Sequence, residues 1–182
     1  MEQKRKAINT YCGVEMDPYA ALPEQIKPED IAHALSLVCR AGGHLRRFYS
    51  VAQHSINCWK EAEAQEYSKR ICLLCLVHDA SEAYIADITR PVKARLTEYL
   101  ELEEQLQTVI LKACGLWPLG EEERLCCKQI DDAMLCAEFE ALHPSGRLFE
   151  SSFTMKNQPE FSECSPKEVE KEWLDAYDIL TK

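Results

Sequence analysis

The stretch His78–Lys93, with the sequence HDASEAYIADITRPVK, concentrates ionisable side chains directly after the apolar run Ile71–Val77. Buried charges are normally paired or bound to a metal, because an unpaired charge is costly to remove from water. Imidazole and carboxylate groups together can bind several divalent metals. The adjacent pair His78 and Asp79 therefore marks this stretch as the candidate working centre of an enzyme.

Two other ionisable residues have spacings that could bring them to the same centre. Glu82 follows His78 by four residues and Asp79 by three, so a helix would place all three on one side. His54 lies in the second turn of another predicted helix, beside apolar residues at helical spacings. A lone histidine on an apolar face is commonly a packed core residue, so His54 becomes a candidate ligand only together with the other groups.

A basic loop and an acidic pair add further candidates. Residues 40–49 hold the densest basic patch of this acidic chain, formed by Arg40, His44, Arg46 and Arg47. A solvated loop is the alternative interpretation of this patch. Asp131 and Asp132 are adjacent on a predicted helix, and Glu138 lies seven residues, or two helical turns, after Asp131.

Hydrophobic periodicity predicts that helices position these residues. The expected helices run from Pro28 to Gly42-Gly43, begin at Ser50, and cover about 69–84, 93–114, 122–142 and a final segment from Ser165. Ser50 and Ser165 each start a capping box, the pattern that opens a helix. Because the residue before a proline avoids helical backbone, Arg90-Pro91 predicts a loop that carries Asp87 and Arg90.

These elements predict an all-α helical bundle in a single domain, residues 1–182. Residues 1–27 are expected to contain a short strand or an extended arm, and residues 143–164 a long loop. The sequence contains no βαβ alternation and no glycine-rich phosphate loop, so a nucleotide-binding α/β fold is not expected.

Charge and cysteine content limit the possible functions. A net charge of −10 argues against non-specific nucleic-acid binding, but permits a small phosphorylated substrate held by a few bases. The N-terminus has no apolar signal segment, so the ten cysteines are expected to be free thiols in a reducing cytoplasm. Cys72 and Cys75 match C-x-x-C but lack the second pair of a zinc ribbon, which favours core packing. No apolar run approaches the ~18 residues that a membrane span requires.

His54, His78-Asp79 and Asp131 occur in the order H…HD…D, and in this order the chain resembles the HD-domain metal-dependent phosphohydrolases. Three strings carry the resemblance: IKPEDIAHALSLVCRAGGHLRRFYSVAQHS, HDASEAYIADITRPVK and KQIDDAMLCAEFEAL. They are similar to the small HD hydrolases related to bacterial 5′-deoxynucleotidases and their phage relatives, and the likeness covers roughly residues 9–142. The implied fold is the HD-domain helical bundle.

The resemblance also implies roles for individual residues. One divalent metal ion would be held by His54, His78, Asp79 and Asp131. Asp131 is favoured over Asp132 by the family pattern D-x-x-M-L and by the spacing of Glu138. Glu82 would activate the attacking water, with Asp87 assisting, and Arg40 would contact phosphate. The further candidates for phosphate contact are His44, Arg90 and Lys93.

The expected ion is Mn²⁺, Co²⁺, Fe²⁺, Ni²⁺, Zn²⁺ or Mg²⁺, with the transition metals favoured because two ligands are nitrogens. The expected reaction is hydrolysis of a (deoxy)nucleoside 5′-monophosphate by metal-activated water. Two alternatives stay open: a deoxynucleoside triphosphate triphosphohydrolase, and a regulatory metal-binding module without turnover. The expected partners are the small nucleotide substrate and further copies of the chain in a dimer or larger homo-oligomer, with no nucleic acid and no membrane.

Overall fold

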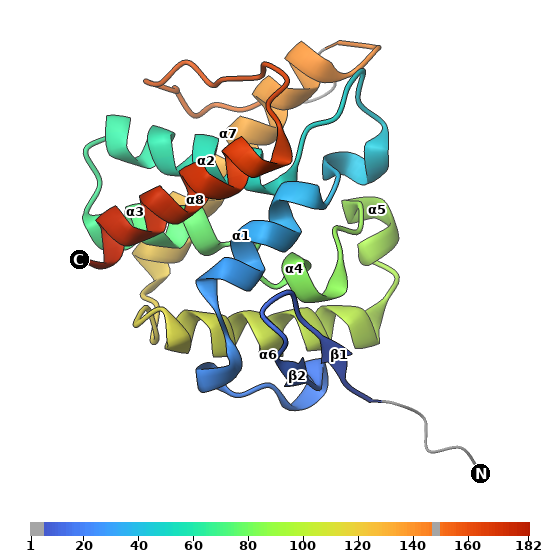
Figure 1. The fold of residues 1–182 in the computed structure, drawn as a ribbon. Coiled ribbons are helices and arrows are strands. Elements are labelled where there is room, and N and C mark those ends of the chain that lie inside the picture. The colour runs from blue at the N-terminus through green and yellow to red at the C-terminus, as the bar shows by residue number, and fades with distance from the viewer. Residues whose placement is uncertain (1–5, 147–149) are drawn as a thin grey trace.

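The helix α3 (Lys69–Val77) is apolar on nearly every side, and it is accordingly buried among other helices (Figure 1). It contacts α2 (Val51–Ala64), α7 (Glu121–Leu142) and α8 (Pro166–Thr181). A computed structural model describes residues 6–146 and 150–182 of the chain. Within these residues the fold is all-α, as predicted, with the addition of one small hairpin.

The remaining elements surround this central group. They are β1 (Ile8–Asn9), β2 (Glu15–Met16), α1 (Pro28–Leu37), α4 (Glu82–Ile85), α5 (Arg90–Lys93) and α6 (Thr97–Ala113), together with the short 3-10 helices η1 (Pro18–Ala20), η2 (Pro23–Gln25) and η3 (Arg40–Gly43). The two strands are antiparallel, with Ile8 opposite Met16, so residues 1–27 contain the predicted strand as half of a hairpin. Helix α1 packs against α8, and both predicted capping boxes are present, at Ser50 and Ser165.

The predicted helix over 69–84 is wrong at residues 78–81, where the chain forms a turn between α3 and α4. Gln107 of α6 stabilises this turn. Its amide nitrogen donates to the carbonyl of Val77 at 2.7 Å, and its amide oxygen accepts from the N–H of Ser81 at 3.0 Å. Because the Gln107 side chain satisfies these two backbone groups, the helix can end at Val77 without leaving them unpaired.

Other predicted boundaries also need correction. The first helix ends at Leu37, before the glycine pair, because the chain then pairs with residues near Ser50: Arg40 donates its N–H to the carbonyl of Tyr49 at 2.9 Å. Arg90 begins the short helix α5 instead of lying on a loop. Pro91 is the second residue of this helix, where a backbone N–H would have no acceptor within the helix, so its absence costs no hydrogen bond. Helix α6 begins at Thr97, not near 93.

Residues 150–164, here called the strap, lie along α2 without forming a helix or strand of their own (Figure 1). The strap is held by three α2 side chains spaced one turn apart, Gln53, Asn57 and Glu61. Asn57 exchanges two hydrogen bonds with the backbone of Glu160, at 2.9 and 3.2 Å. The predicted loop over 143–164 is therefore a docked segment where it is described, and residues 147–149 lie outside the described part of the chain.

Replacing Glu61 with alanine is expected to lower the free energy of unfolding by about 2–4 kcal/mol. The Glu61 carboxylate is fully buried and accepts from the backbone N–H groups of Lys156 at 3.0 Å and Asn157 at 2.8 Å. Its removal would leave both donors unpaired. Urea unfolding measures the change, and Glu63→Ala, an exposed position on the same helix, is the control. Equal midpoints for the two variants would show that Glu61 does not fix the strap.

All ten cysteines are free thiols, as predicted, and Cys72 and Cys75 are buried in the core. Across residues 6–146 and 150–182, none of the helices has both the length and the apolar character needed to cross a membrane.

Candidate metal centre

His54, His78, Asp79 and Asp131, here called the His–Asp centre, converge from α2, the end of α3 and α7. The Nε2 atoms of the two histidines are 3.2 Å apart. From His54 Nε2, Asp79 Oδ2 lies at 3.7 Å and Asp131 Oδ1 at 3.3 Å. From His78 Nε2, the same oxygens lie at 3.4 and 3.8 Å. Four residues spread over 77 positions of the sequence, from His54 to Asp131, thus bring two nitrogens and two oxygens close together.

In each histidine, Nε2 faces the centre and Nδ1 makes a hydrogen bond that orients the ring. His54 Nδ1 donates to the Glu138 carboxylate at 2.6 Å, and His78 Nδ1 donates to the carbonyl of Cys75 at 2.8 Å. Carboxylates and carbonyls can only accept, so Nδ1 carries the proton in both rings. The Nε2 atoms consequently face each other, which is the arrangement usual for metal-ligating histidines.

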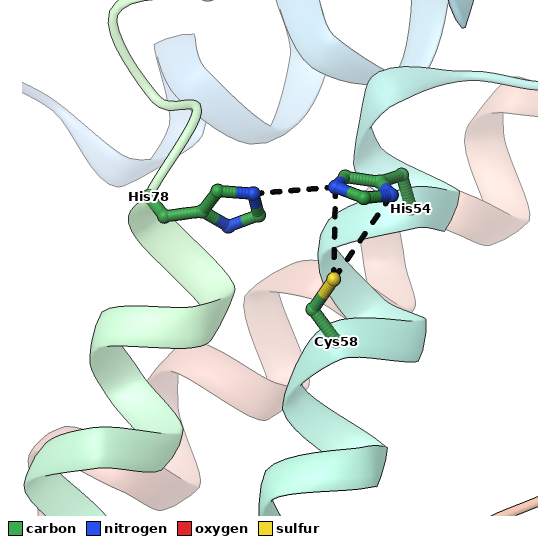
Figure 2. Close-up of side chains that lie close together, drawn as sticks. All are labelled: His54, Cys58 and His78. Atoms are coloured by element: carbon green, nitrogen blue, oxygen red, sulfur yellow. Dashed lines mark hydrogen bonds between the residues drawn. The ribbon is translucent and has the colours of Figure 1, made fainter. Parts of the chain in front are cut away.

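Cys58 brings a sulfur atom to the same two rings (Figure 2). It follows His54 by one turn of α2, and its Sγ lies 3.6 Å from His54 Nε2. The donor atoms of His54, Cys58 and His78 all lie within 4.8 Å of one another, so this group could hold a metal ion. Burial raises the pKa of the Cys58 thiol well above its ordinary value, and the charges of Asp131 and Glu138 raise it further.

The electrostatics of the His–Asp centre favour a cation. Although burial opposes ionisation, the charge of His78 and the Arg40 guanidinium lower the pKa of the Asp79 carboxyl, and the two histidines lower that of Asp131. Burial likewise opposes a charge on His78, yet Asp79 and Asp131 raise the pKa of its imidazole well above the ordinary value. The carboxylates thus draw positive charge toward the Nε2 atoms, where a metal ion would bind.

Glu82 lies beside the centre with an unused oxygen. The side chain is 3% exposed, and its Oε2 is buried with no hydrogen-bond partner among the described residues. Its Oε1 is 3.5 Å from Lys93 Nζ. Burial raises the pKa of Glu82 to about 9, and the charges of Asp79 and Asp87 contribute to the increase. A buried carboxyl with a free oxygen and a raised pKa is suited to holding and releasing a proton.

Arg40, the predicted phosphate contact, is buried among the acids of the centre. Its guanidinium lies 3.1 Å from Asp79, 3.5 Å from Asp131 and 3.4 Å from Glu138. It also donates to His54 Nε2 at 3.1 Å. Although burial opposes its charge, these carboxylates raise the pKa of Arg40, so it stays a cation. Arg40 therefore balances the buried negative charge, a role that its place in the predicted basic loop does not indicate.

Two other predicted site residues, Asp87 and His44, are near the turn that carries Arg40 but are not part of the His–Asp centre. Asp87 Oδ2 accepts from the backbone N–H of Ala41 at 3.0 Å, which fixes the turn that carries Arg40. This turn has left-handed backbone, with φ of 55° at Ala41 and 60° at Gly42. His44 is exposed, and within the described residues no hydrogen bond or ion pair joins its side chain to the centre.

The remaining predicted bases, Arg90 and Lys93, are bound to acids. Arg90 donates to Asp131 Oδ2 at 2.8 Å and to Asp132 Oδ1 at 2.9 Å. Lys93 lies 2.6 Å from Glu103. Asp131 thus has one oxygen toward the histidines and one toward Arg90, whereas Asp132 also pairs with a surface lysine on its own helix. Of the two aspartates, the structure brings Asp131 to the centre, although its role as a ligand stays a prediction.

Two residues around the centre were not singled out from the sequence. Cys58 has a detectable signal, because it follows His54 by four residues and so shares its helix face. Gln107 has none, because its contacts with the turn after α3 join residues more than twenty positions apart.

Alanine at Asp131 is expected to remove metal, whereas alanine at Asp132 should leave metal binding unchanged within about twofold, because only Asp131 reaches the histidines. Metal content after dialysis measures both. The neighbouring positions share a helix and the partner Arg90, so they form a matched pair. Loss of metal from the Asp132 variant alone would show that Asp132, and not Asp131, is the ligand.

No family model matches this chain. The chain is 42% identical over 112 residues to a protein of Escherichia coli K12 named Uncharacterized protein YfdR, covering 62% of this chain and 60% of that protein. It is 36% identical over 119 residues to Uncharacterized protein RCAP_rcc00048 of Rhodobacter capsulatus, with the same two coverages of 62% and 60%. The chain therefore matches about three fifths of the length of each relative, and neither name states an activity.

Proposed function

We propose that this protein is an HD-type phosphohydrolase that uses one divalent metal ion to hydrolyse nucleoside 5′-monophosphates. The observation that carries the proposal is the His–Asp centre, in which two oriented imidazoles and two carboxylates converge. The order of these residues and the three strings that resemble the HD hydrolases supply the reaction class and the substrate class.

The donor set fits such an ion. Nitrogen and oxygen ligands lie about 2.0–2.2 Å from a divalent metal, so neighbouring ligands of one ion are about 3.0–3.5 Å apart. The five separations measured from the histidine nitrogens are 3.2–3.8 Å, close to this spacing. Glu82 Oε2, buried without a partner in the described part of the chain, is the orphaned polar atom expected beside a site for water or substrate.

A divalent ion in this centre would lower the pKa of a bound water and offset charge on the phosphoryl group. Glu82 Oε2 would take the proton from the attacking water. A nearby cation favours the ionised form of a carboxyl, so the high pKa of Glu82 would fall as the site fills. Lys93, close to Glu82 and bound to Glu103, would hold the carboxyl in place.

Arg40 would then bind the phosphate of the substrate. Its N–H groups now bind His54 Nε2 and Asp79, two of the groups that would turn to the metal. Once released, the guanidinium offers paired donors that match phosphate oxygens. In this proposal Asp87 is a positioning residue, because it fixes the turn that presents Arg40 and has no hydrogen bond or ion pair to the centre among the described residues.

A phosphate-release screen tests the proposed function. Purified protein is incubated with nucleoside monophosphates and triphosphates in the presence of Mn²⁺, Co²⁺ or Mg²⁺, and the products are separated by chromatography. Orthophosphate from monophosphates is the expected result. Release of triphosphate from a deoxynucleoside triphosphate would overturn the monophosphate assignment, and no turnover with metal bound would reduce the protein to a regulatory metal-binding module.

A further inference from the structure

The two histidines of the His–Asp centre are shared by two different donor sets. One set adds the carboxylates Asp79 and Asp131, and the other adds the thiol of Cys58 (Figure 2). The carboxylates come from the turn after α3 and from α7, whereas Cys58 is on α2 together with His54. Hard and borderline ions prefer the first set, and soft ions prefer a thiolate.

The geometry of the second set suits a soft ion. Metal–sulfur bonds of zinc are about 2.3 Å and metal–nitrogen bonds about 2.0 Å, so a tetrahedral ion would separate its sulfur and nitrogen ligands by about 3.5 Å. Cys58 Sγ is 3.6 Å from His54 Nε2, and the two Nε2 atoms are 3.2 Å apart. Both rings are already oriented by Glu138 and the carbonyl of Cys75. Arg40, which binds His54 Nε2, would have to release it, as it would for the carboxylate set.

We infer that His54, Cys58 and His78 form a thiophilic metal site that takes a soft ion such as Cd²⁺ in competition with the ion used for hydrolysis. On binding, the Cys58 sulfur–hydrogen bond breaks, the proton passes to solvent, and the thiolate sulfur bonds to the metal, with no change of oxidation state. The binding stands on this donor set alone, and only the competition rests on the proposed function. Soft ions are then expected to inhibit the hydrolase through Cys58.

Cadmium binding to the full chain tests the inference. Metal-free protein, kept reduced with a phosphine, is titrated with Cd²⁺, and the ultraviolet charge-transfer band of the cadmium–thiolate bond is followed. Cys58→Ser is expected to lose this band and to weaken Cd²⁺ binding by about tenfold or more, while Mn²⁺ binding stays within about twofold. Cys72→Ser is the matched control, because Cys72 is also a buried thiol but contacts the carbonyl of Tyr67.

Each outcome decides the inference separately from the hydrolase proposal. An unchanged cadmium band in Cys58→Ser would overturn it, as would equal losses of Cd²⁺ and Mn²⁺ affinity in that variant, or loss of the band in Cys72→Ser. Thermal melting of each variant checks that it is folded. If the phosphate-release screen finds no hydrolysis, the wild-type protein is still expected to show the cadmium–thiolate band, because this band depends only on metal binding. If hydrolysis is observed, Cd²⁺ should inhibit the wild-type protein at about tenfold or more lower concentration than Cys58→Ser.

Discussion

Alanine in place of His78 is expected to abolish stable metal binding and to reduce metal-dependent kcat/KM by at least about a hundredfold. The His78 imidazole contributes one of the two facing nitrogens and lies within 3.4 Å of Asp79. Without it, the centre keeps one nitrogen and two carboxylates, a weaker donor set for a transition metal. Calorimetric titration with Mn²⁺ and the rate of phosphate release measure the two effects.

His33→Ala is the matched control for this variant. His33 also pairs with an acid, lying 3.1 Å from Glu170 of α8, but it is a partly exposed residue of α1 that stacks on Tyr11. Its replacement should leave both metal affinity and turnover unchanged. A His78 variant that retains metal and full activity would exclude the His–Asp centre as the site of reaction.

Glutamine in place of Glu82 is expected to preserve metal binding and to reduce kcat by about 10²–10⁴-fold, the usual effect of losing a general base. The amide cannot take a proton from water, whereas the carboxyl oxygen Oε2 could do so once a bound cation has lowered the pKa of Glu82. The folded metal-free protein should not lose stability at pH 7. The pKa of Glu82 is about 9 in the fold, above its ordinary value, so the carboxyl must already take up a proton on folding, and glutamine removes that cost.

Glu103→Gln is the control for Glu82, because both acids contact Lys93 and only Glu82 is buried beside the centre. Steady-state kinetics would separate kcat from KM, and metal analysis would follow the same samples. Loss of metal together with turnover would make Glu82 a ligand, and unchanged kcat would remove its role as a base.

The residues of the centre were predictable from the sequence, because their types and order carry the signal. The same holds for the helices that begin at Ser50 and Ser165, where local capping contacts decide the start. Local patterns could not reveal the turn after α3, because the amide that stabilises it comes from Gln107. They placed Arg40 in a basic loop and left open whether that loop was solvated, whereas three carboxylates from distant segments hold Arg40 inside.

The strap was unpredictable for a related reason. Its apolar residues Phe153, Met155 and Phe161 fall on alternate positions and pack against the core, but they are too few to predict where the segment docks. Its position along α2 is set by long-range bonds from polar side chains of that helix, including a bond from Gln53 to the carbonyl of Ser162. The polar residues and Pro159 of the strap otherwise follow the ordinary pattern of an exposed loop. Buried acceptors on α2, such as Glu61, and the apolar contacts of the strap distinguish this docked segment from such a loop.

Helix α2 serves the strap and the centre with two adjacent stripes. Gln53, Asn57 and Glu61 form one stripe, and His54 and Cys58, each one residue later in the sequence, form the other. Successive residues of a helix are about 100° apart, so a rotation by one residue would move the Gln53 stripe into the place of the His54 stripe and turn an amide toward the His–Asp centre. The contacts of the strap and of the centre consequently resist rotation of α2, and the angular position of His54 is fixed from two faces of its helix.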